Sequence, residues 1–60
     1  MTTGEALEIV KNYGESWGYP GMLETLEGML EANHRDELYF EEKKAFRIVW
    51  NEFSRMFQPA

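Results

Sequence analysis

Glu31 and His34 form a Glu-x-x-His pair, a spacing that can bind metal ions. In four-helix carboxylate proteins, such pairs project inward from two of the helices and bind two iron or manganese ions. A symmetric dimer would supply two copies, and Glu24 or Glu27 would complete the ligand set. The spacing is also common by chance, and on a helix Glu31 falls opposite Leu26. Metal binding is therefore an alternative, and the main interpretation is that His34 interacts with the negative C-terminal end of a helix.

Residues suited to catalysis are scarce. Nucleophilic catalysis needs a nucleophile, a base and an orienting group, but the chain has no Cys and a single His. Carboxylates are plentiful, yet acid–base chemistry needs one of them shielded in a pocket. The five glycines form no phosphate-binding loop. The sequence predicts that the protein is not an enzyme and uses no cofactor.

Glu24, Glu27 and Glu31 form an acidic stripe, because a helix brings positions i, i+3 and i+7 to one side. Like charges at these spacings repel each other, and mixed signs would be enough for solubility. One interpretation is an ordinary acidic surface. The sharper hypothesis is that the stripe docks on a basic surface of a partner protein.

The stretch of residues 41–57 carries a basic patch. Asn51 lies between its four bases, which are Lys43, Lys44, Arg47 and Arg55. Such a helix can lie along a phosphate backbone, so nucleic-acid binding is a second alternative. The net charge of −5 argues against it, because an acidic protein is repelled by nucleic acids and anionic membranes. Ile48 falls off the apolar face, and with Arg47 and Asn51 it resembles an interface anchor with a charged rim.

Three amphipathic helices are predicted to position these side chains. The aromatic helix, at about 37–57, has apolar residues at steps of three and four on one face. These residues are Phe46, Val49, Trp50, Phe53, Met56 and Phe57. Because aromatic burial is the largest apolar contribution per residue, we expect this helix to organise the core. Its start can fall anywhere from Arg35 to Glu41, and Asn33 or Asp36 is the candidate cap.

The other two helices are predicted at about 3–17 and 20–32. Thr2 and Glu5 fit a capping box, and Gly18 suits a left-handed end followed by Pro20 in the first turn of the next helix. The predicted apolar faces are Ala6, Leu7, Val10, Tyr13 and Trp17, then Met22, Leu23, Leu26, Met29 and Leu30. Gly14 lies on the first face and is expected to allow a close neighbour. Gly28 falls beside the acidic residues on the exposed face of the second helix, where it has no evident packing role.

Sixty residues make one domain. Three amphipathic helices with short connections predict that this domain, over residues 1–60, is an all-α three-helix up-down-up bundle whose third helix is the longest and most aromatic. Hydrophobic residues make up 43% of the chain, which is too apolar for a disordered segment. No apolar run approaches the length of a membrane span. The N-terminus resembles no signal peptide, so the expected location is the cytoplasm.

Three segments carry a resemblance to a known group: TTGEALEIVKNYG, LETLEGMLE and EEKKAFRIVWNEFSRMF. Together they resemble small acidic helical orphan proteins encoded by tailed bacteriophages, including those of cyanobacteria. The resemblance implies a protein made in the host cytoplasm during infection that binds a host or phage protein. It transfers no functional residue, because the group has no shared site.

The sequence therefore predicts a small non-enzymatic helical protein that acts by protein–protein contact, either as a monomer or as a weak homodimer. The candidate contact residues are Glu24, Glu27, Glu31, Arg47, Ile48 and Asn51. The alternatives are a metal-binding homodimer through Glu31 and His34, and a weak nucleic-acid binder through the basic patch.

Overall fold

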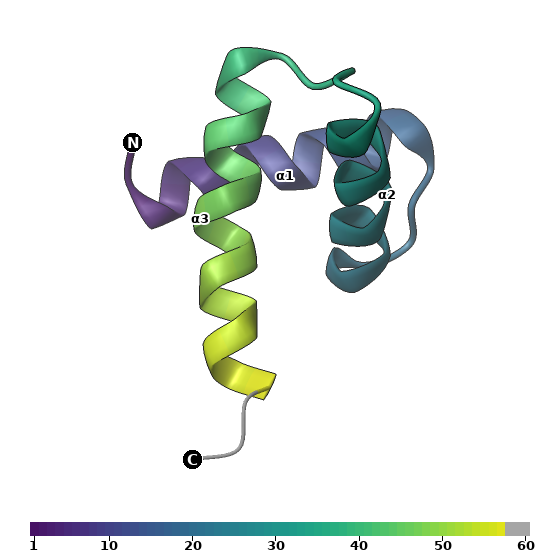
Figure 1. The fold of residues 1–60 in the computed structure, drawn as a ribbon. Helices are drawn as coiled ribbons and strands as arrows, with labels where there is room; N and C mark the ends of the chain where they lie inside the picture. Colours follow the sequence, from purple (N-terminus) through teal and green to yellow (C-terminus); the bar gives the residue numbers. More distant parts are fainter. Residues whose placement is uncertain (58–60) are drawn as a thin grey trace.

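The protein folds into three α-helices. The computed structural model describes the backbone of residues 1–57 and the side chains of residues 1–55. The helices are α1 (Thr3–Trp17), α2 (Met22–His34) and α3 (Phe40–Phe57), and no strand occurs within residues 1–57 (Figure 1). This confirms the predicted all-α class, with α3 as the longest helix.

Both ends of α1 follow the predicted pattern. The Thr2 hydroxyl accepts a hydrogen bond from the Glu5 N–H at 3.2 Å, and the Thr2 N–H donates to Oε1 of Glu5 at 3.2 Å. This reciprocal capping box satisfies N–H groups that the first turn cannot pair within the helix. At the other end, Gly18 has a φ of 74°, the left-handed conformation that glycine adopts without a steric penalty.

The start of α2 differs from the prediction. Pro20 lies outside the helix, which begins at Met22 after Gly21 as the N-cap residue. The reason is that Gly21 is fully extended, so the helical conformation cannot include Pro20. The Gly21 carbonyl accepts hydrogen bonds from both the Thr25 N–H at 2.9 Å and the Thr25 hydroxyl at 2.8 Å.

The turn after α2 delays the start of α3. Asp36 adopts a φ of 56°, and the next residue, Glu37, donates its N–H to the Ala32 carbonyl at 2.9 Å. The Asp36 N–H also bonds to the Asn33 carbonyl at 3.1 Å, which completes the hydrogen-bond pattern of a Schellman motif. Because these residues finish α2, the third helix starts at Phe40, within the range from Arg35 to Glu41 that the sequence leaves open and three positions after the approximate bound of 37.

Tyr39 stands at the cap position of α3, so the prediction of Asn33 or Asp36 as its cap is wrong. The Tyr39 carbonyl accepts the Lys43 N–H at 2.9 Å, and the Tyr39 N–H donates to Oε1 of Glu42 at 2.9 Å. Asp36 instead accepts a hydrogen bond from Nζ of Lys43 at 2.7 Å. This contact ties the end of α2 to the first turn of α3.

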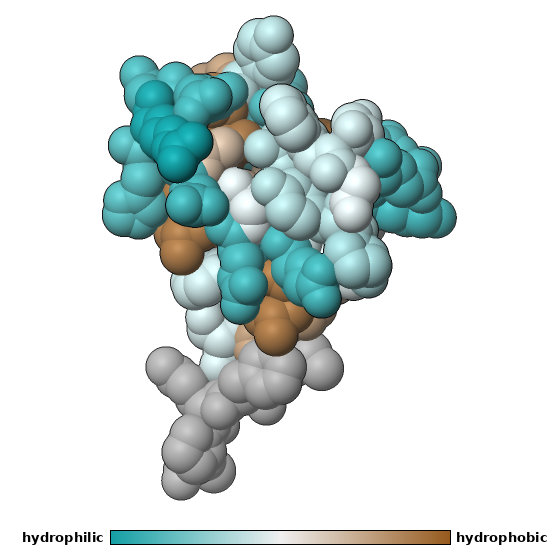
Figure 2. Space-filling view, turned by 90° about the vertical axis from the view of Figure 1, so that its right-hand side faces the viewer, coloured by the Kyte–Doolittle hydropathy of each residue, from teal (hydrophilic) through white to brown (hydrophobic). Residues whose placement is uncertain are grey.

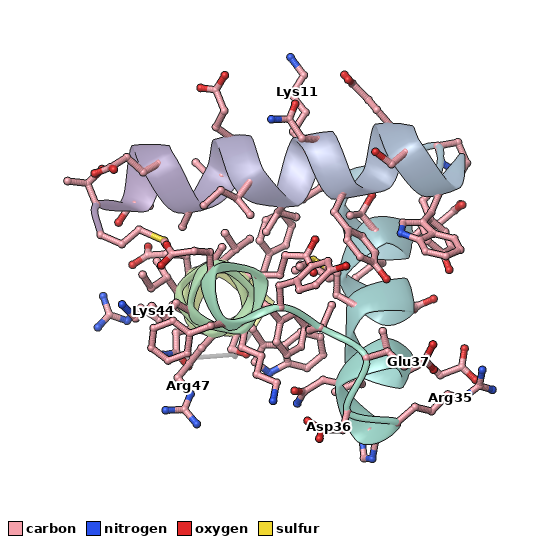
Figure 3. The ribbon with its side chains drawn as sticks, turned by 90° about the horizontal axis from the view of Figure 1, so that it is seen from above. Lys11, Arg35, Asp36, Glu37, Lys44 and Arg47 are labelled. Atoms are coloured by element: carbon pink, nitrogen blue, oxygen red, sulfur yellow. The ribbon has the colours of Figure 1, made fainter. Side chains whose placement is uncertain are left out.

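All three helices contribute to one hydrophobic core. Its buried residues are Ala6, Val10, Leu26, Met29, Leu38, Ala45, Phe46 and Val49. The helices cross more steeply than an up-down-up bundle implies: α1 passes across α3 in Figure 1, and Figure 3 looks down α3 with α1 and α2 seen lengthwise. A steep crossing covers only part of each apolar face.

The steep crossing explains why some residues of the predicted apolar faces are exposed. Trp17 is 66% exposed, Trp50 is 37% exposed, and Leu7 and Leu23 are also on the surface. Conversely, Ile48 was predicted outside the core, and it is half-buried and packs against it. The predictions for the side chains of Met56 and Phe57 lie outside the described residues.

Candidate functional site

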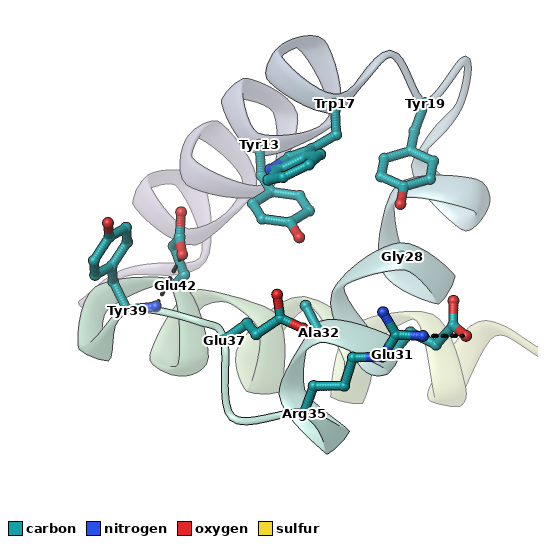
Figure 4. Close-up of a pocket in the computed structure, with 10 residues that line it drawn as sticks. All are labelled: Tyr13, Trp17, Tyr19, Gly28, Glu31, Ala32, Arg35, Glu37, Tyr39 and Glu42. Carbon is teal, nitrogen blue, oxygen red and sulfur yellow. Dashed lines mark hydrogen bonds and ion pairs between the residues drawn. The ribbon is translucent and has the colours of Figure 1, made fainter.

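The first candidate site is a hollow of about 250 Å³ between the end of α1, the middle of α2 and the loop before α3 (Figure 4). Four aromatic side chains line it: Tyr13, Trp17, Tyr19 and Tyr39. Three carboxylates and one guanidinium also line it: Glu31, Glu37, Glu42 and Arg35. We name it the aromatic–acidic hollow.

Gly28 forms the base of this hollow beside Tyr19. It is buried, which contradicts the expectation that it lies on an exposed face without a packing role. An added Cβ atom at Gly28 would lie 2.6 Å from Cε2 and 2.7 Å from Oη of Tyr19, closer than such atoms approach in folded proteins. The absence of a side chain at Gly28 therefore lets the Tyr19 ring rest directly on α2.

Tyr13 and Trp17 form the wall contributed by α1. They are four residues apart, and their ring centroids are 6.0 Å apart with an interplanar angle of 35°. Burial raises the pKa of the Tyr13 hydroxyl, and the nearby Tyr19, Glu42 and Glu37 raise it further. The cause is that burial and neighbouring negative charges both disfavour the phenolate.

Arg35 lies at the rim of the hollow. Its Nη2 atom is 3.8 Å from Oε1 of Glu31, and both side chains are largely exposed. An exposed ion pair of this kind contributes little to stability, typically below about 1 kcal/mol. The pair can therefore open at low cost to admit another cation.

The predicted acidic stripe borders the same hollow. Glu24, Glu27 and Glu31 are all exposed, and with Tyr19 and Gly28 they line a shallow depression on the outer side of α2. Figure 2 shows the side of the molecule that carries α2, where hydrophilic groups separate small hydrophobic patches. The stripe is thus continuous with the hollow through Glu31.

The second candidate site lies on the outer side of α3. Phe40, Lys44, Arg47, Trp50 and Asn51 line a hollow of about 490 Å³, together with three neighbouring residues. We name these five residues the basic–aromatic face. Figure 3 shows Lys44 and Arg47 pointing away from α1, on a different side from Arg35 and Glu37. The face includes two predicted contact residues, Arg47 and Asn51.

The aromatic rings of this face are unusually accessible. Phe40 is 69% exposed, and Nζ of Lys44 lies 4.6 Å from its ring centroid. Trp50 is partly exposed and stacks on Phe46, with 5.6 Å between the ring centroids. An ammonium over a ring is a favourable cation–π contact. The surface therefore offers apolar ring area beside positive charge.

The predicted basic patch is divided by its ion pairs. Lys43 pairs with Asp36 at 2.7 Å, and Arg55 has an oxygen of Glu52 at 4.0 Å. Among the residues that the structure describes, Arg47 has no ion-pair partner. The charge available on this side is therefore centred on Lys44 and Arg47.

The metal alternative gains no support from the geometry. Glu31 and His34 are both exposed, and the oxygen of Glu31 is already close to Arg35. No group of three or more His, Cys, Asp or Glu side chains within the described residues could hold a metal ion. A site of this kind would require ligands from a second copy.

Sequence reasoning missed the aromatic–acidic hollow. Helical spacing places Tyr13 and Trp17 on the core face of α1, and it gives no role to Tyr19, which lies between Gly18 and Pro20. The available signal was the spacing of Tyr13, Trp17 and Tyr19 around the Gly18 turn. The contribution of Glu37 and Tyr39 could not be found, because the turn after α2 brings them there.

Comparisons with protein-family models, with curated proteins and with solved structures give no match for this chain. Within the described residues, no helix has the length and apolar character needed to span a membrane.

Proposed function

We propose that the protein is a small non-enzymatic binding protein that docks an acidic segment of a partner protein on its basic–aromatic face. The observation that carries this proposal is the pair of exposed rings, Phe40 and Trp50, beside the charges of Lys44 and Arg47. Aromatic residues and Arg are the types most enriched at protein interfaces, and they supply most of the hot-spot energy.

The choice of an acidic protein segment follows from the charge of the whole molecule. Lys44 and Arg47 give a local positive field, whereas the chain carries a net charge of −5. A long nucleic acid would extend past this face and meet the acidic remainder of the molecule, which repels it. A short acidic segment with one or two apolar residues interacts with the local field alone.

The cellular setting is proposed from the resemblance to phage proteins. In that setting the partner is a host or phage protein, and the contact forms in the host cytoplasm. The acidic stripe of Glu24, Glu27 and Glu31 is the alternative contact surface, for a basic partner, and a partner bound there would contact α2 instead of the basic–aromatic face. Its long-range effect is to steer association, which salt screens.

A photo-crosslinking experiment tests the proposed face. A benzophenone amino acid is placed at Phe40, and in a control protein at Leu23, which is exposed on α2. After irradiation in an extract of the cells that make the protein, we expect a protein adduct from position 40 and none from position 23. The crosslinked peptide should be rich in Asp and Glu.

Charge variants sharpen this experiment. Lys44→Gln with Arg47→Gln should abolish the adduct, whereas Lys11→Gln, a control on the far side of α1, should leave it intact. An adduct of equal yield from position 23, a peptide without acids, or an adduct with nucleic acid would each contradict the proposal.

A weak homodimer is the second candidate, because one molecule carries both an acidic stripe and a basic–aromatic face. Ile48→Asp is not a clean test, since Ile48 packs against the core and the substitution would destabilise the fold. Arg47→Glu changes an exposed residue instead. If copies associate through these charges, sedimentation should show a dimer that salt and Arg47→Glu both dissociate.

A further inference from the structure

Three of the four rings that line the aromatic–acidic hollow come from α1 and the turn that follows it, and the fourth, Tyr39, comes from the loop before α3. Tyr13 and Trp17 come from α1, and Tyr19 comes from the turn after it and faces the hollow from beside Gly28 (Figure 4). The face of an aromatic ring carries negative charge and attracts a cation within about 6 Å of its centroid. Three rings around one small space are an arrangement suited to a cation.

The charged groups of the hollow also favour a cation. Glu31, Glu37 and Glu42 line it against a single cation in the lining, Arg35. Figure 4 shows the Glu37 carboxylate directed toward the space below the Tyr13 ring. Burial raises the pKa of the Tyr13 hydroxyl most, followed by Tyr19, and then by the carboxylates of Glu42 and Glu37, which are close enough to act on a group in the hollow. The potential inside the hollow is therefore negative.

Size and ligand type narrow the choice of cation. The volume of about 250 Å³ is below the range of about 300–1,000 Å³ that is usual for drug-sized ligands, so it suits a single small group. Calcium takes six to eight oxygen ligands, and the described residues offer no cluster of three carboxylates for a metal ion. A methylated ammonium group needs no coordinating oxygens, and its methyl groups pack on rings.

We propose that the aromatic–acidic hollow binds a methylated ammonium group, of the kind carried by choline or by a trimethylated lysine side chain. Tyr13, Trp17 and Tyr19 contact the methyl groups, and Glu37 balances the charge. Arg35, which lies beside Glu31, carries a positive charge and therefore competes with the ligand for the carboxylates of the hollow. This site is separate from the basic–aromatic face, and its existence does not depend on the function proposed for that face.

An NMR titration of the whole chain tests the site with a charged probe and its neutral isostere. Choline chloride is compared with 3,3-dimethyl-1-butanol, which has the same shape without the charge, and sodium chloride controls for ionic strength. We expect millimolar choline to shift the indole N–H resonance of Trp17 and the amides of Tyr19 and Gly28. The neutral alcohol should produce no saturating shift.

Three variants assign the binding to this hollow. Trp17→Leu changes an exposed residue and should weaken choline binding at least about fivefold. Arg35→Gln removes the competing cation and should tighten binding by up to about fivefold, the range of an exposed ion pair. Trp50→Leu, the matched control on the basic–aromatic face, should leave choline binding unchanged.

A second titration separates the two sources of the ligand group. If a trimethyllysine peptide binds more tightly than choline, and the same peptide without the methyl groups does not bind, the natural source of the ligand group is a protein tail. Equal affinities identify a free quaternary ammonium compound. Equal shifts from choline and the neutral alcohol would overturn the proposal. Choline shifts unaffected by Trp17→Leu, or no choline shift at all, would also overturn it.

Discussion

At the scale of single residues, the contact between Gly14 and Thr25 sets the distance between α1 and α2. An added Cβ at Gly14 would lie 3.1 Å from Cγ2 of Thr25 and closer still to its Oγ1. Thr25 cannot move aside easily, because it is buried and its hydroxyl donates to the Gly21 carbonyl at 2.8 Å. The expected close approach at Gly14 is thus confirmed, with Thr25 as the neighbour.

Gly14→Ala should destabilise the fold despite the higher helix propensity of alanine. Overpacking typically costs about 1–3 kcal/mol, and the propensity gain of about 1 kcal/mol offsets part of it. Urea unfolding measures the net change in the free energy of unfolding that these two effects produce. Thr25→Ala in the same chain removes both clashing atoms, so the double variant should be more stable than the sum of the single effects predicts. Additive effects would show that the two residues do not limit the approach of the helices.

At the scale of elements, α3 holds the core through one side and leaves aromatic rings on the other. Phe46 is only 7% exposed, whereas Phe40, at the start of the same helix, is 69% exposed. The two positions are six residues apart, so they point to different sides of the helix. The pair offers a comparison of one residue type in two environments.

Phe46→Ala should cost roughly 3–5 kcal/mol of unfolding free energy, because it removes a buried ring and leaves a cavity. Phe40→Ala removes an exposed ring and its contact with Lys44, and should cost less than about 1 kcal/mol. A domain of this size is only marginally stable, so Phe46→Ala is expected to be largely unfolded. Far-UV circular dichroism and urea unfolding distinguish the two outcomes. Similar losses from both variants would mean that the core side of α3 is misassigned.

At the scale of the whole molecule, stability should depend on acid pH through two exposed carboxylates. Hydrogen bonds from the backbone and then the side chain of Thr2 lower the pKa of Glu5 below 4.5. A hydrogen bond from Lys43, and then its charge, lowers the pKa of Asp36 below 3.8. Since each folded pKa lies below its ordinary value, the unfolded chain binds protons first as the pH falls.

The stabilisation from these two groups is fully present above their ordinary pKa values, and it is lost as the pH falls through the folded values. The urea midpoint should therefore change little from neutral pH to about pH 5 and fall below about pH 4. Glu5→Gln combined with Asp36→Asn should lower the midpoint at neutral pH and reduce its loss in acid. The control variant Glu8→Gln, which changes an exposed residue of α1, should show the same fall of the urea midpoint in acid as the unchanged chain. If the urea midpoint of the double variant fell as steeply in acid, the contacts of Glu5 with Thr2 and of Asp36 with Lys43 would be excluded as the cause of the fall.

The local features of the fold follow from short-range signals in the sequence. The capping box of Thr2 and Glu5, the left-handed Gly18 and the amphipathic α3 were all predicted, because each depends on residues a few positions apart. The bounds of α1 were predicted for the same reason. Short-range hydrogen bonds and helical periodicity are encoded within one segment, so no knowledge of the neighbouring helices was needed.

How the helices cross, and which side chains the crossing brings together, depends on contacts between segments that are far apart in the chain. Periodicity identifies an apolar face, but it does not determine how much of that face another helix covers. Trp17 is therefore exposed, Ile48 packs against the core, and Gly28 lies beneath Tyr19. The aromatic–acidic hollow depends on this crossing, because its side chains come from separate segments of the chain. The basic–aromatic face lies on α3 alone, and the crossing affects it through Trp50, which periodicity assigns to the core and which is partly exposed.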